Sequence, residues 1–418
     1  MDTDIKRVLR DNMKTETERF DLSGRTVAVV GLGKSGQAAL SVLLQGKAGN
    51  SCRVIVSESR SDGVLESLPG ELRRGVAAIQ TGGHTGEFLG QADFIILSPG
   101  VPITAPAVVS AKKSGVPVVS EMEFGYRLIG CPVVAITGTN GKTTTTNLTG
   151  EMFSRAGYKV EVAGNIGRPL SDVVAAGEQP DLVVLEVSSF QLEAVRQFKA
   201  NGALILNVTP DHLNRHGTFE TYADVKFRVF DRQRPDDVAV LNLDDPVSRD
   251  YILACEKLEK PNGDGTVFLF SRYRPVTAGV SVAAGKILFR PHGPGRESVE
   301  VAGLDDVRLR GEHNLENVLG AVALGCGLGL SPEPIRKAIR TFEGVVHRLE
   351  SVAMVGQVEF INDSKATNVA STRCAVKALD KPFIIILGGY DKNADFTELA
   401  GDIADLGIRT VLMGDTRF

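Results

Sequence analysis

The sequence has no apolar run long enough to cross a membrane, which takes about 20 residues. The nearest candidate, 321–330, is too short and is rich in glycine. The first twenty residues are charged and lack the apolar core of a secretory signal peptide. These absences predict a cytoplasmic chain without membrane spans.

Metal-ligand and disulfide patterns are also missing. The histidines and cysteines show no CxxC pair and no regular His/Cys spacing, and the five cysteines are Cys52, Cys131, Cys255, Cys326 and Cys374. An odd number of scattered cysteines indicates reduced thiols in a cytosolic protein. The formal net charge of −4 argues against a general nucleic-acid binder, because such proteins are mostly basic.

Short β-branched runs alternate with helix-like segments along the 418 residues, which favours two or three α/β domains with parallel sheets. The first part of this pattern ends near Gly130-Cys131-Pro132. We therefore assign residues 1–130 to a Rossmann-like domain. Its expected strands are 26–30, 53–56, 94–97 and 116–119, and its expected helices are 35–45 and 106–114.

The pattern restarts at residue 131 and continues to Phe342-Glu343-Gly344. Residues 260–310 change to Gly/Pro punctuation with short alternating strands, which predicts a small antiparallel extension. We assign 131–343 to a central P-loop-type ATPase domain. Its expected strands are 133–136, 182–186, 203–207, 238–241, 266–270 and 286–289, and its later helices are 314–326 and 332–341.

The last segment, 344–418, has fewer elements than a doubly wound sheet needs to cover both faces. The sequence stops just beyond a strand, where such folds build ligand loops. We interpret the segment as an incomplete Rossmann-like domain and the chain as truncated. Its expected strands are 352–360, 383–387 and 410–413, and its expected helices are 369–379 and 397–403.

The loop Gly138-Thr139-Asn140-Gly141-Lys142-Thr143 lies between a strand and a helix. Its glycines can expose backbone N–H groups to phosphate, Lys142 can reach a β- or γ-phosphate, and the Thr143 hydroxyl can hold Mg²⁺. The spacing departs from GxxxxGK[ST], because Ile136 stands where the first glycine belongs. A Gly-Lys-Thr-Thr sequence at such a junction nevertheless has few structural uses, so the loop predicts ATP binding.

Gly31-Leu32-Gly33-Lys34-Ser35-Gly36 fits GxGxxG, and Glu58 follows at the end of the next strand. The pattern is typical of NAD or FAD sites. Physically it requires only a diphosphate at a helix N-terminus, which a nucleotide-sugar diphosphate also offers. A tight turn that needs glycine is the alternative. Ser98-Pro99-Gly100 ends another strand of this sheet and is either a ligand loop or a simple Pro-Gly turn.

Two polar residues end later strands of the central domain. Glu186 stands where a second magnesium ligand belongs, or alternatively it pairs with a helix dipole. His212 follows the next strand and should reach the same face. A lone histidine is more often structural, but the nearby phosphate loop and Glu186 favour a functional role for His212. Lys226 lies in an amphipathic helix pattern whose spacing alone predicts a solvated lysine.

The C-terminal segment carries three further motifs. His347-Arg348 follows the second linker directly. Asn362-Asp363-Ser364-Lys365-Ala366-Thr367-Asn368 places a carboxylate, a cation and hydroxyls at a helix N-terminus, suited to a phosphate or a carboxylate substrate. Helix capping is the alternative for this run. Gly388-Gly389-Tyr390-Asp391-Lys392 ends the next strand and adds a second lysine.

Together these segments closely resemble the Mur ligases, ATP-dependent amide-forming enzymes of peptidoglycan precursor synthesis. The resemblance runs from residue 26 to the end, and 186–192, 363–368 and 388–392 resemble the branch that adds D-glutamate to UDP-N-acetylmuramoyl-L-alanine. It implies an N-terminal UDP site, a central ATPase and a third domain that closes over the amino acid. We expect a monomer.

The resemblance implies a ligand for each motif. The UDP-substrate would be held by Gly31, Leu32, Gly33, Lys34, Ser35, Glu58, Ser59, Gly100, Asn165 and His212. ATP would be held by Gly138, Thr139, Asn140, Gly141, Lys142, Thr143, Thr144, Asn314, Asn317, Arg348, Asp363 and Lys365. Thr367 and Lys392 would bind D-glutamate. Two Mg²⁺ ions would be held by Thr143, Glu186, His212 and Lys226.

The resemblance also implies the chemistry, with Lys142, Glu186, His212 and Lys226 as the catalytic set. Lys226 would carry an N-carbamate, which turns a cation into a metal-binding carboxylate. The substrate carboxylate would be phosphorylated by ATP, and the D-glutamate amine would then form the amide. Family members continue with a serine-containing loop at the D-glutamate site. We therefore expect this chain to bind the UDP-substrate but to ligate weakly or not at all.

Three alternatives remain open at this point. Another ligase of the superfamily would add L-alanine, a diamino acid or glutamate to a different acceptor. An NAD(P)-dependent oxidoreductase would explain the GxGxxG pattern but would leave Lys142, Glu186 and the run at Asp363 without a role. A catalytically inactive binding module is favoured only by the truncation.

Overall fold

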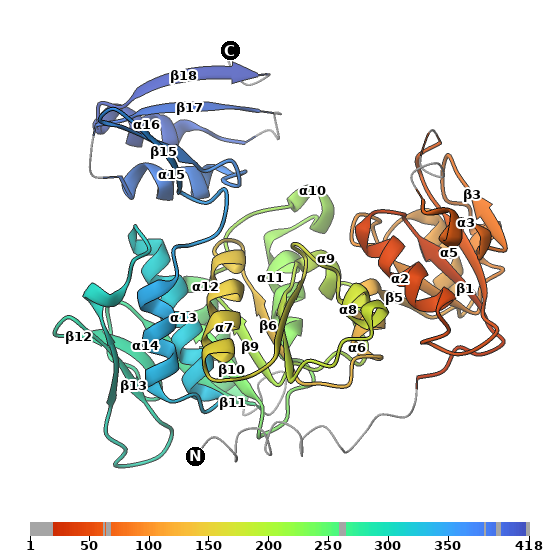
Figure 1. Cartoon of the computed structure of the whole chain (residues 1–418), viewed down its shortest axis with the longest axis horizontal. Helices are drawn as coiled ribbons and strands as arrows, with labels where there is room; N and C mark the ends of the chain where they lie inside the picture. The colour runs from red at the N-terminus through yellow and green to blue at the C-terminus, as the bar shows by residue number, and fades with distance from the viewer. Residues whose placement is uncertain are drawn as a thin grey trace.

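A computed structural model describes residues 20–61, 63, 68–258, 265–379, 382–389 and 394–414. Within these ranges, no helix combines the length and the apolar character that crossing a membrane requires. The described chain forms two large sheets and two small ones, and Figure 1 shows them in three groups that follow the order of the sequence.

The N-terminal sheet is parallel, with the strand order β3-β2-β1-β4-β5. The strands are β1 (Thr26–Val30), β2 (Arg53–Ser57), β3 (Ala78–Gln80), β4 (Phe94–Leu97) and β5 (Val118–Ser120). The helices are α2 (Lys34–Leu44), α3 (Gly70–Arg74), α4 (Gly86–Leu89), α5 (Pro106–Lys113) and α6 (Glu121–Tyr126). The strand order reverses between β1 and β4, and open α/β sheets bind ligands at such a switch point. The predicted Rossmann-like sheet is confirmed.

The central sheet has nine strands in the order β14-β13-β12-β11-β10-β9-β6-β8-β7. Its parallel part contains β6 (Val133–Thr137), β7 (Val160–Gly164), β8 (Leu182–Glu186), β9 (Gly202–Ile205), β10 (Val238–Asn242), β11 (Thr266–Ser271) and β12 (Gly279–Ala283). Strands β8, β6 and β9 are neighbours, so the loops that follow them meet at one edge. The phosphate loop and the segments after Glu186 and Ile205 start at this edge.

The antiparallel extension is present but smaller than predicted. It is formed by β12, β13 (Lys286–Arg290) and β14 (Val299–Gly303). The strand expected at 266–270 does not belong to it, because β11 pairs in parallel with β10. The stretch rich in Gly and Pro begins before the strands become antiparallel. Amino-acid composition alone does not reveal whether two neighbouring strands are parallel or antiparallel.

Helices cover both faces of the central sheet. One face packs against α7 (Lys142–Arg155), α13 (Glu312–Gly327) and α14 (Pro332–Thr341). The other face carries α8 (Leu170–Ala176) and α11 (Phe219–Phe227), and its buried residues form one cluster with residues of the N-terminal sheet. The shorter helices of this region are α9 (Ser189–Leu192), α10 (Leu213–His216), η1 (Arg228–Phe230), α12 (Pro246–Leu258) and η2 (Leu304–Asp306). The shared core ties the first two groups of elements together.

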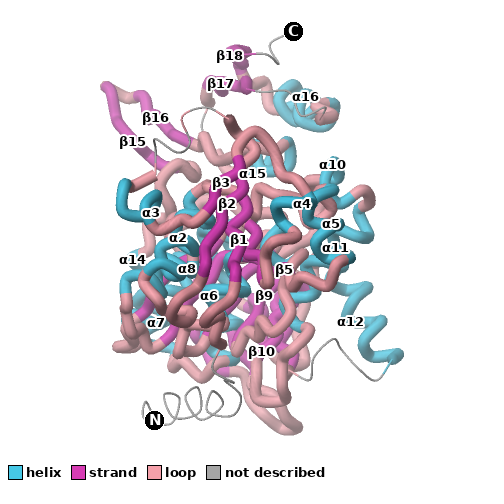
Figure 2. Tube along the Cα trace, turned by 90° about the vertical axis from the view of Figure 1, so that its right-hand side faces the viewer, coloured by secondary structure: helices cyan, strands magenta, loops and turns pink. Residues whose placement is uncertain are grey.

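The C-terminal elements form two separate small sheets. The strand predicted at 352–360 is wrong: β15 (Glu350–Val355) and β16 (Val358–Asn362) form an antiparallel hairpin. Gly356 has a φ of 60°, a left-handed conformation that lets the chain reverse inside an apolar run. Strands β17 (Ile384–Gly389) and β18 (Arg409–Gly414) pair in parallel, with α15 (Val369–Lys377) and α16 (Thr397–Asp405) beside them. In both views these elements lie at one end of the molecule (Figure 1, Figure 2).

A buried carboxyl group lies where the N-terminal and central elements meet. Glu121, the first residue of α6, is fully buried, and its Oε1 accepts a hydrogen bond of 2.7 Å from the backbone N–H of Ser171 in α8. Burial raises the pKa of Glu121 to about 7, although the hydrogen bonds from Ser171 oppose this shift. The folded chain therefore keeps a proton that the unfolded chain releases near pH 4.5.

We expect the contribution of Glu121 to the stability of the protein to fall as pH rises from 4.5 to 7, because the folded-state pKa of Glu121 is raised. The effect at this one group is on the order of 3 kcal/mol. The substitution Glu121→Gln removes it. The difference in unfolding midpoint between wild type and variant, measured in urea from pH 4.5 to 8, should shift in favour of the variant up to about pH 7 and then level off. A difference that does not vary with pH would contradict the assignment.

Candidate active site

The phosphate loop joins the end of β6 to the start of α7 at Lys142. Gly138 and Gly141 have φ values of 151° and 84°, which L-residues other than glycine rarely adopt. These conformations turn the loop so that helix α7 begins directly behind it, with Thr143 and Thr144 buried in its first turn. The first backbone N–H groups of a helix have no partner within the helix, so this end can hold a phosphate.

Two lysine side chains converge on carbonyl oxygens of this loop. Lys142 Nζ donates to Gly138 O at 2.9 Å and to Thr139 O at 2.7 Å, and Lys226 Nζ donates to Gly138 O at 2.7 Å. The expectation that Lys226 is solvated is wrong, because its side chain is only 1 % exposed. Burial, and next the charge of Lys142, hold the pKa of Lys226 well below its usual range. The pKa of Lys142 is also lowered, mainly by burial.

Carboxylates lie close to these two amines. Glu186 and Asp211 each favour the charged forms of Lys142 and Lys226. Glu186 Oε1 accepts a hydrogen bond of 3.0 Å from Asn165 Nδ2, while its buried Oε2 has no hydrogen-bond partner among the described residues. An unpartnered buried carboxylate oxygen suits a cation such as Mg²⁺, which prefers oxygen ligands. Within the described ranges, no group of three or more His, Cys, Asp or Glu residues is arranged to hold a metal by itself.

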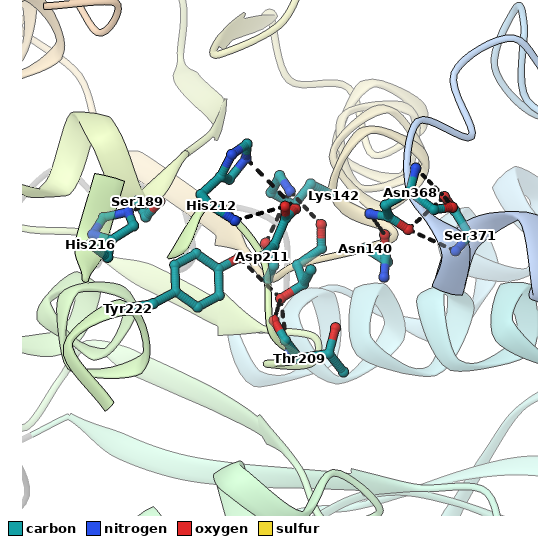
Figure 3. Close-up of polar contacts among 12 residues, drawn as sticks. Asn140, Lys142, Ser189, Thr209, Asp211, His212, His216, Tyr222, Asn368 and Ser371 are labelled. Carbon is teal, nitrogen blue, oxygen red and sulfur yellow. Dashed lines mark hydrogen bonds and ion pairs between the residues drawn. The ribbon is translucent and has the colours of Figure 1, made fainter. Parts of the chain in front are cut away.

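The loop is braced by residues to which the sequence analysis gave no role. The Thr139 hydroxyl donates to Thr209 O at 3.0 Å and lies 3.1 Å from the Tyr222 hydroxyl. Asn140 N donates to Asn207 Oδ1 at 2.9 Å, and Asn207 Nδ2 donates back to Asn140 O at 3.2 Å. Figure 3 shows Thr209, Asp211 and Tyr222 around the loop. These contacts fix the backbone that would surround a phosphate.

His212 lies beside the loop in a left-handed conformation with a φ of 52°. Its backbone N–H donates to Asp211 Oδ1 at 2.8 Å, and its Nε2 is 3.6 Å from Asp211 Oδ2. The side chain is 48 % exposed. The structure therefore brings His212 to the expected edge of the sheet, where it can reach a ligand without unfolding the loop.

A cavity of about 390 Å³ lies between the glycine-rich loop and the central domain. It is lined by nine of the residues expected to hold the UDP-substrate: Gly31, Leu32, Gly33, Lys34, Ser35, Glu58, Ser59, Gly100 and Asn165. His212, the tenth, does not line it. Asn165 connects the cavity to the phosphate loop through its hydrogen bond to Glu186.

Arg60 and Gln191 also line this cavity and were not predicted to do so. Gln191 is buried, and its Nε2 has no acceptor among the described residues, so it can donate to a ligand. Glu58 accepts from Leu32 N at 2.7 Å and pairs with Arg60 at 3.1 Å. Burial opposes ionisation of Glu58, but these hydrogen bonds outweigh it and lower its pKa to about 2. Glu58 is therefore ionised at neutral pH.

The expected ATP residues of α13 lie against the phosphate loop. Asn317 is buried, and its Nδ2 donates to Asn314 Oδ1 at 3.1 Å. A Cβ atom added at Gly141 would stand 2.0 Å from Asn317 Oδ1, so the amide group touches the loop. Arg348 reaches the same place from the C-terminal side, with its Nη2 3.4 Å from Thr143 Oγ1.

The run at 362–368 lies at the start of α15, as predicted. Asp363 Oδ1 accepts from Leu349 N at 3.1 Å, Lys365 is half-buried and Thr367 is exposed. Asn368 was given no role, yet it caps α15 and donates from Nδ2 to Asn140 Oδ1 at 3.3 Å (Figure 3). Lys392, expected at the D-glutamate site, lies outside the described residues.

Comparison with protein families gives two matches. Residues 25–120 match the N-terminal domain described as Mur ligase MurD-like, and residues 136–325 match the Mur ligase middle domain. A UDP-N-acetylmuramoylalanine–D-glutamate ligase of Thermoanaerobacter sp. (strain X514) is 40 % identical over 397 residues, which are 95 % of this chain and 84 % of that protein. The ligase of the same name from Koribacter versatilis (strain Ellin345) is 43 % identical over 381 residues, 91 % of this chain and 81 % of that one.

Solved structures agree on the fold. MurF from Acinetobacter baumannii has a TM-score of 0.55 at 19 % identity and is covered over 79 % of its length by 95 % of this chain. UDP-N-acetylmuramate–alanine ligase from Thermotoga maritima has a TM-score of 0.54 at 18 % identity, with 94 % of this chain and 91 % of that one covered. At these identities the likeness concerns the fold alone.

We predict that Gly141→Ala weakens ATP binding at least about tenfold, because the new methyl group displaces the Asn317 amide. Gly157→Ala is the matched control: Gly157 has a similar φ of 86° but no atom within 4 Å of the added Cβ. Both variants carry the same backbone strain. Calorimetric titration with Mg-ATP should separate them. Equal ATP affinities in the two variants would show that the loop does not contact the nucleotide.

Proposed function

The chain belongs to the Mur ligase family, and we propose that it is an ATP-dependent ligase that joins D-glutamate to UDP-N-acetylmuramoyl-L-alanine in peptidoglycan precursor synthesis. The relatives of about 40 % identity that carry this name support the proposal. One structural observation carries it: the cavity lined by the residues that we expect to hold a UDP-linked substrate lies next to the phosphate loop, and Asn165 and Glu186 join the two through one hydrogen bond.

Formation of an amide from a carboxylate requires activation, because a carboxylate is a poor acyl donor. We place the alanyl carboxylate at the Asn165 end of the cavity, facing the phosphate loop. One carboxylate oxygen attacks the γ-phosphorus of ATP, the bond from that phosphorus to the β-phosphate oxygen breaks, and ADP leaves. Lys142 and the backbone N–H groups at the start of α7 stabilise the charge on the transferred phosphoryl group.

The second step uses the resulting acyl phosphate. The neutral amine of D-glutamate attacks its carbonyl carbon, the C–O bond to phosphate breaks, and the nitrogen loses a proton as the amide forms. We assign Thr367 and Lys392 to the carboxylates of D-glutamate, as the resemblance implies; Thr367 lies between β16 and α15, and Lys392 is outside the described residues. The contacts of Arg348 and Asn368 with the phosphate loop would hold that segment over the site and exclude water.

We assign two Mg²⁺ ions to this site, held by Thr143, Glu186, His212 and a carbamylated Lys226. When bound, Mg²⁺ offsets the negative charge of the phosphates. The unpartnered Oε2 of Glu186 fits such a role. Lys226 in its amine form places a second positive group beside Lys142 in a buried site, whereas a carbamate would pair with Lys142 and with a cation. The remaining ATP contacts are assigned to Asn314, Asn317, Arg348, Asp363 and Lys365.

A carbamate on Lys226 can be detected directly. In ¹³C-bicarbonate the wild-type protein should show a carbamate carbonyl signal by ¹³C NMR, and Lys226→Met should lose both this signal and most of the activity. Lys199→Met is the control. Lys199 is a mostly buried lysine paired with Asp237 at 3.0 Å, and it precedes the amino end of β9, at the edge of the sheet away from the phosphate loop. A signal that survives Lys226→Met, or that is absent from wild type, would rule out carbamylation at this residue.

We also propose that the protein works as a cytoplasmic monomer without nucleic-acid partners. Cys52, Cys131, Cys326 and Cys374 are free thiols, a state that a reducing compartment maintains. The oligomeric state is measured by light scattering at working concentration.

The activity is tested by phosphate release from ATP in the presence of Mg²⁺ and UDP-N-acetylmuramoyl-L-alanine, with and without D-glutamate. Whatever its rate, phosphate release should depend on both substrates. L-Alanine and a diamino acid, tested in place of D-glutamate, should give none. Release that prefers another amino acid would assign the chain to a different ligase of the family, and binding of NAD(P) at the glycine-rich loop would favour an oxidoreductase.

A further inference from the structure

One arginine links the two sides of the UDP-substrate cavity. Arg215 lies in α10, three residues after His212, and its side chain is only 11 % exposed. Its Nη1 donates to Pro99 O at 2.7 Å, and its Nη2 donates to Val101 O at 3.3 Å. A central-domain guanidinium thus holds two carbonyl groups of the N-terminal domain.

The segment that Arg215 holds is a wall of the cavity. Ser98, Pro99, Gly100 and Val101 all line it. Val101 N donates to Ser98 O at 3.0 Å, and Ser98 Oγ donates to Gly31 O at 2.7 Å, so this turn also supports the neighbouring glycine-rich loop. A shift of the turn would therefore move both walls that face a diphosphate.

The charge of Arg215 is balanced by Glu193, which follows α9. The pair is bidentate, with Nε to Oε1 at 3.0 Å and Nη2 to Oε2 at 2.6 Å. Glu193 Oε1 also lies 3.5 Å from His216 Nδ1, and His216 Nε2 lies 3.0 Å from Ser189 Oγ. Bidentate pairing orients the planar guanidinium, which leaves its outer N–H groups directed at the two carbonyls.

The side chains of Arg215 and His212 pack against the same aromatic ring. The guanidinium carbon of Arg215 lies 4.1 Å from the centroid of Phe190, and the ring of His212 lies 4.8 Å from the same centroid. Phe190 belongs to α9, close behind Glu186. The side chain that holds the cavity wall therefore also packs in the cluster that positions His212.

We propose that Arg215 is a positioning residue that sets the distance between the diphosphate end and the muramoyl end of the UDP-substrate site. It contacts no reacting atom. It keeps the turn at Pro99–Val101 at a fixed position relative to the His212 segment. A UDP-linked substrate can therefore contact the diphosphate end and the muramoyl end of the site at the same time. This role rests on the proposed function, since it concerns the substrate of that same site.

The test is Arg215→Lys, which keeps the charge but cannot hold Glu193 and two carbonyls with one ammonium group. We expect the dissociation constant and KM for UDP-N-acetylmuramoyl-L-alanine to rise about tenfold, as the loss of one charge-assisted hydrogen bond would produce. The affinity for UDP alone should fall less than that for the whole substrate. The KM for ATP should rise less than the KM for the UDP-substrate, because Arg215 contacts the cavity wall directly and reaches His212 only through Phe190.

Arg127→Lys is the matched control. The Arg127 side chain is also 11 % exposed, pairs with Glu123 at 2.6 Å, and stacks over Phe20 at 5.1 Å, but it contacts no cavity wall. It should lose a similar amount of thermal stability and keep wild-type values for the UDP-substrate. This comparison separates a positioning role from a loss of stability.

Three results would overturn the inference. Arg215→Lys could bind the UDP-substrate as well as Arg127→Lys does, it could lose UDP and the whole substrate equally, or it could lose ATP to the same extent. If the wild-type protein releases phosphate normally, any of these three results for Arg215→Lys leaves the proposed function intact. A wild-type protein that binds no UDP-substrate overturns both.

Discussion

The site depends on two lysine amines that both donate hydrogen bonds to the same loop. Lys142 and Lys226 both donate to the carbonyl of Gly138, and burial together with their mutual repulsion lowers the pKa of Lys226. Such a pair is tolerated where negative charge compensates it or where one amine loses its proton. Glu186 and Asp211 supply part of that charge, and a polyphosphate would supply more. The loop, the strand ends and the hydrogen bonds that brace them all serve to hold these charges in place.

The way in which the domains are joined fits this arrangement. The N-terminal sheet and one face of the central sheet share a single buried cluster, and Glu121 seals their junction. The UDP-substrate cavity therefore has walls from two domains that cannot easily separate. The C-terminal elements meet the phosphate loop through polar contacts, Arg348 to Thr143 and Asn368 to Asn140. Contacts of this kind break and form at little cost, which suits the role that we propose for this segment, to admit an amino acid and then close.

Sequence patterns predicted the parts of this site that rest on local backbone geometry. Gly31 and Gly138 have positive φ values directly after strands, as does Gly141 directly before α7, so the sequence alone indicates where the glycine-rich loop and the phosphate loop lie. Patterns failed where the outcome depends on what packs against a residue. Helical spacing assigned Lys226 to the solvent, although the phosphate loop covers it. The turn at Gly356 was hidden inside an apolar run. Arg60 and Gln191 line a cavity whose walls come from distant parts of the chain, and Arg215 acts through the distant Pro99 and Val101.

The central claim is that the substrate carboxylate itself attacks ATP and keeps its oxygen on the departing phosphate. It is tested most directly with UDP-N-acetylmuramoyl-L-alanine labelled with ¹⁸O in the alanyl carboxylate, with ATP, Mg²⁺ and D-glutamate. Mass spectrometry of the released phosphate should show one ¹⁸O atom for each amide formed. Phosphate that carries no label would contradict an acyl-phosphate route, and label found in AMP would show activation through the α-phosphate instead.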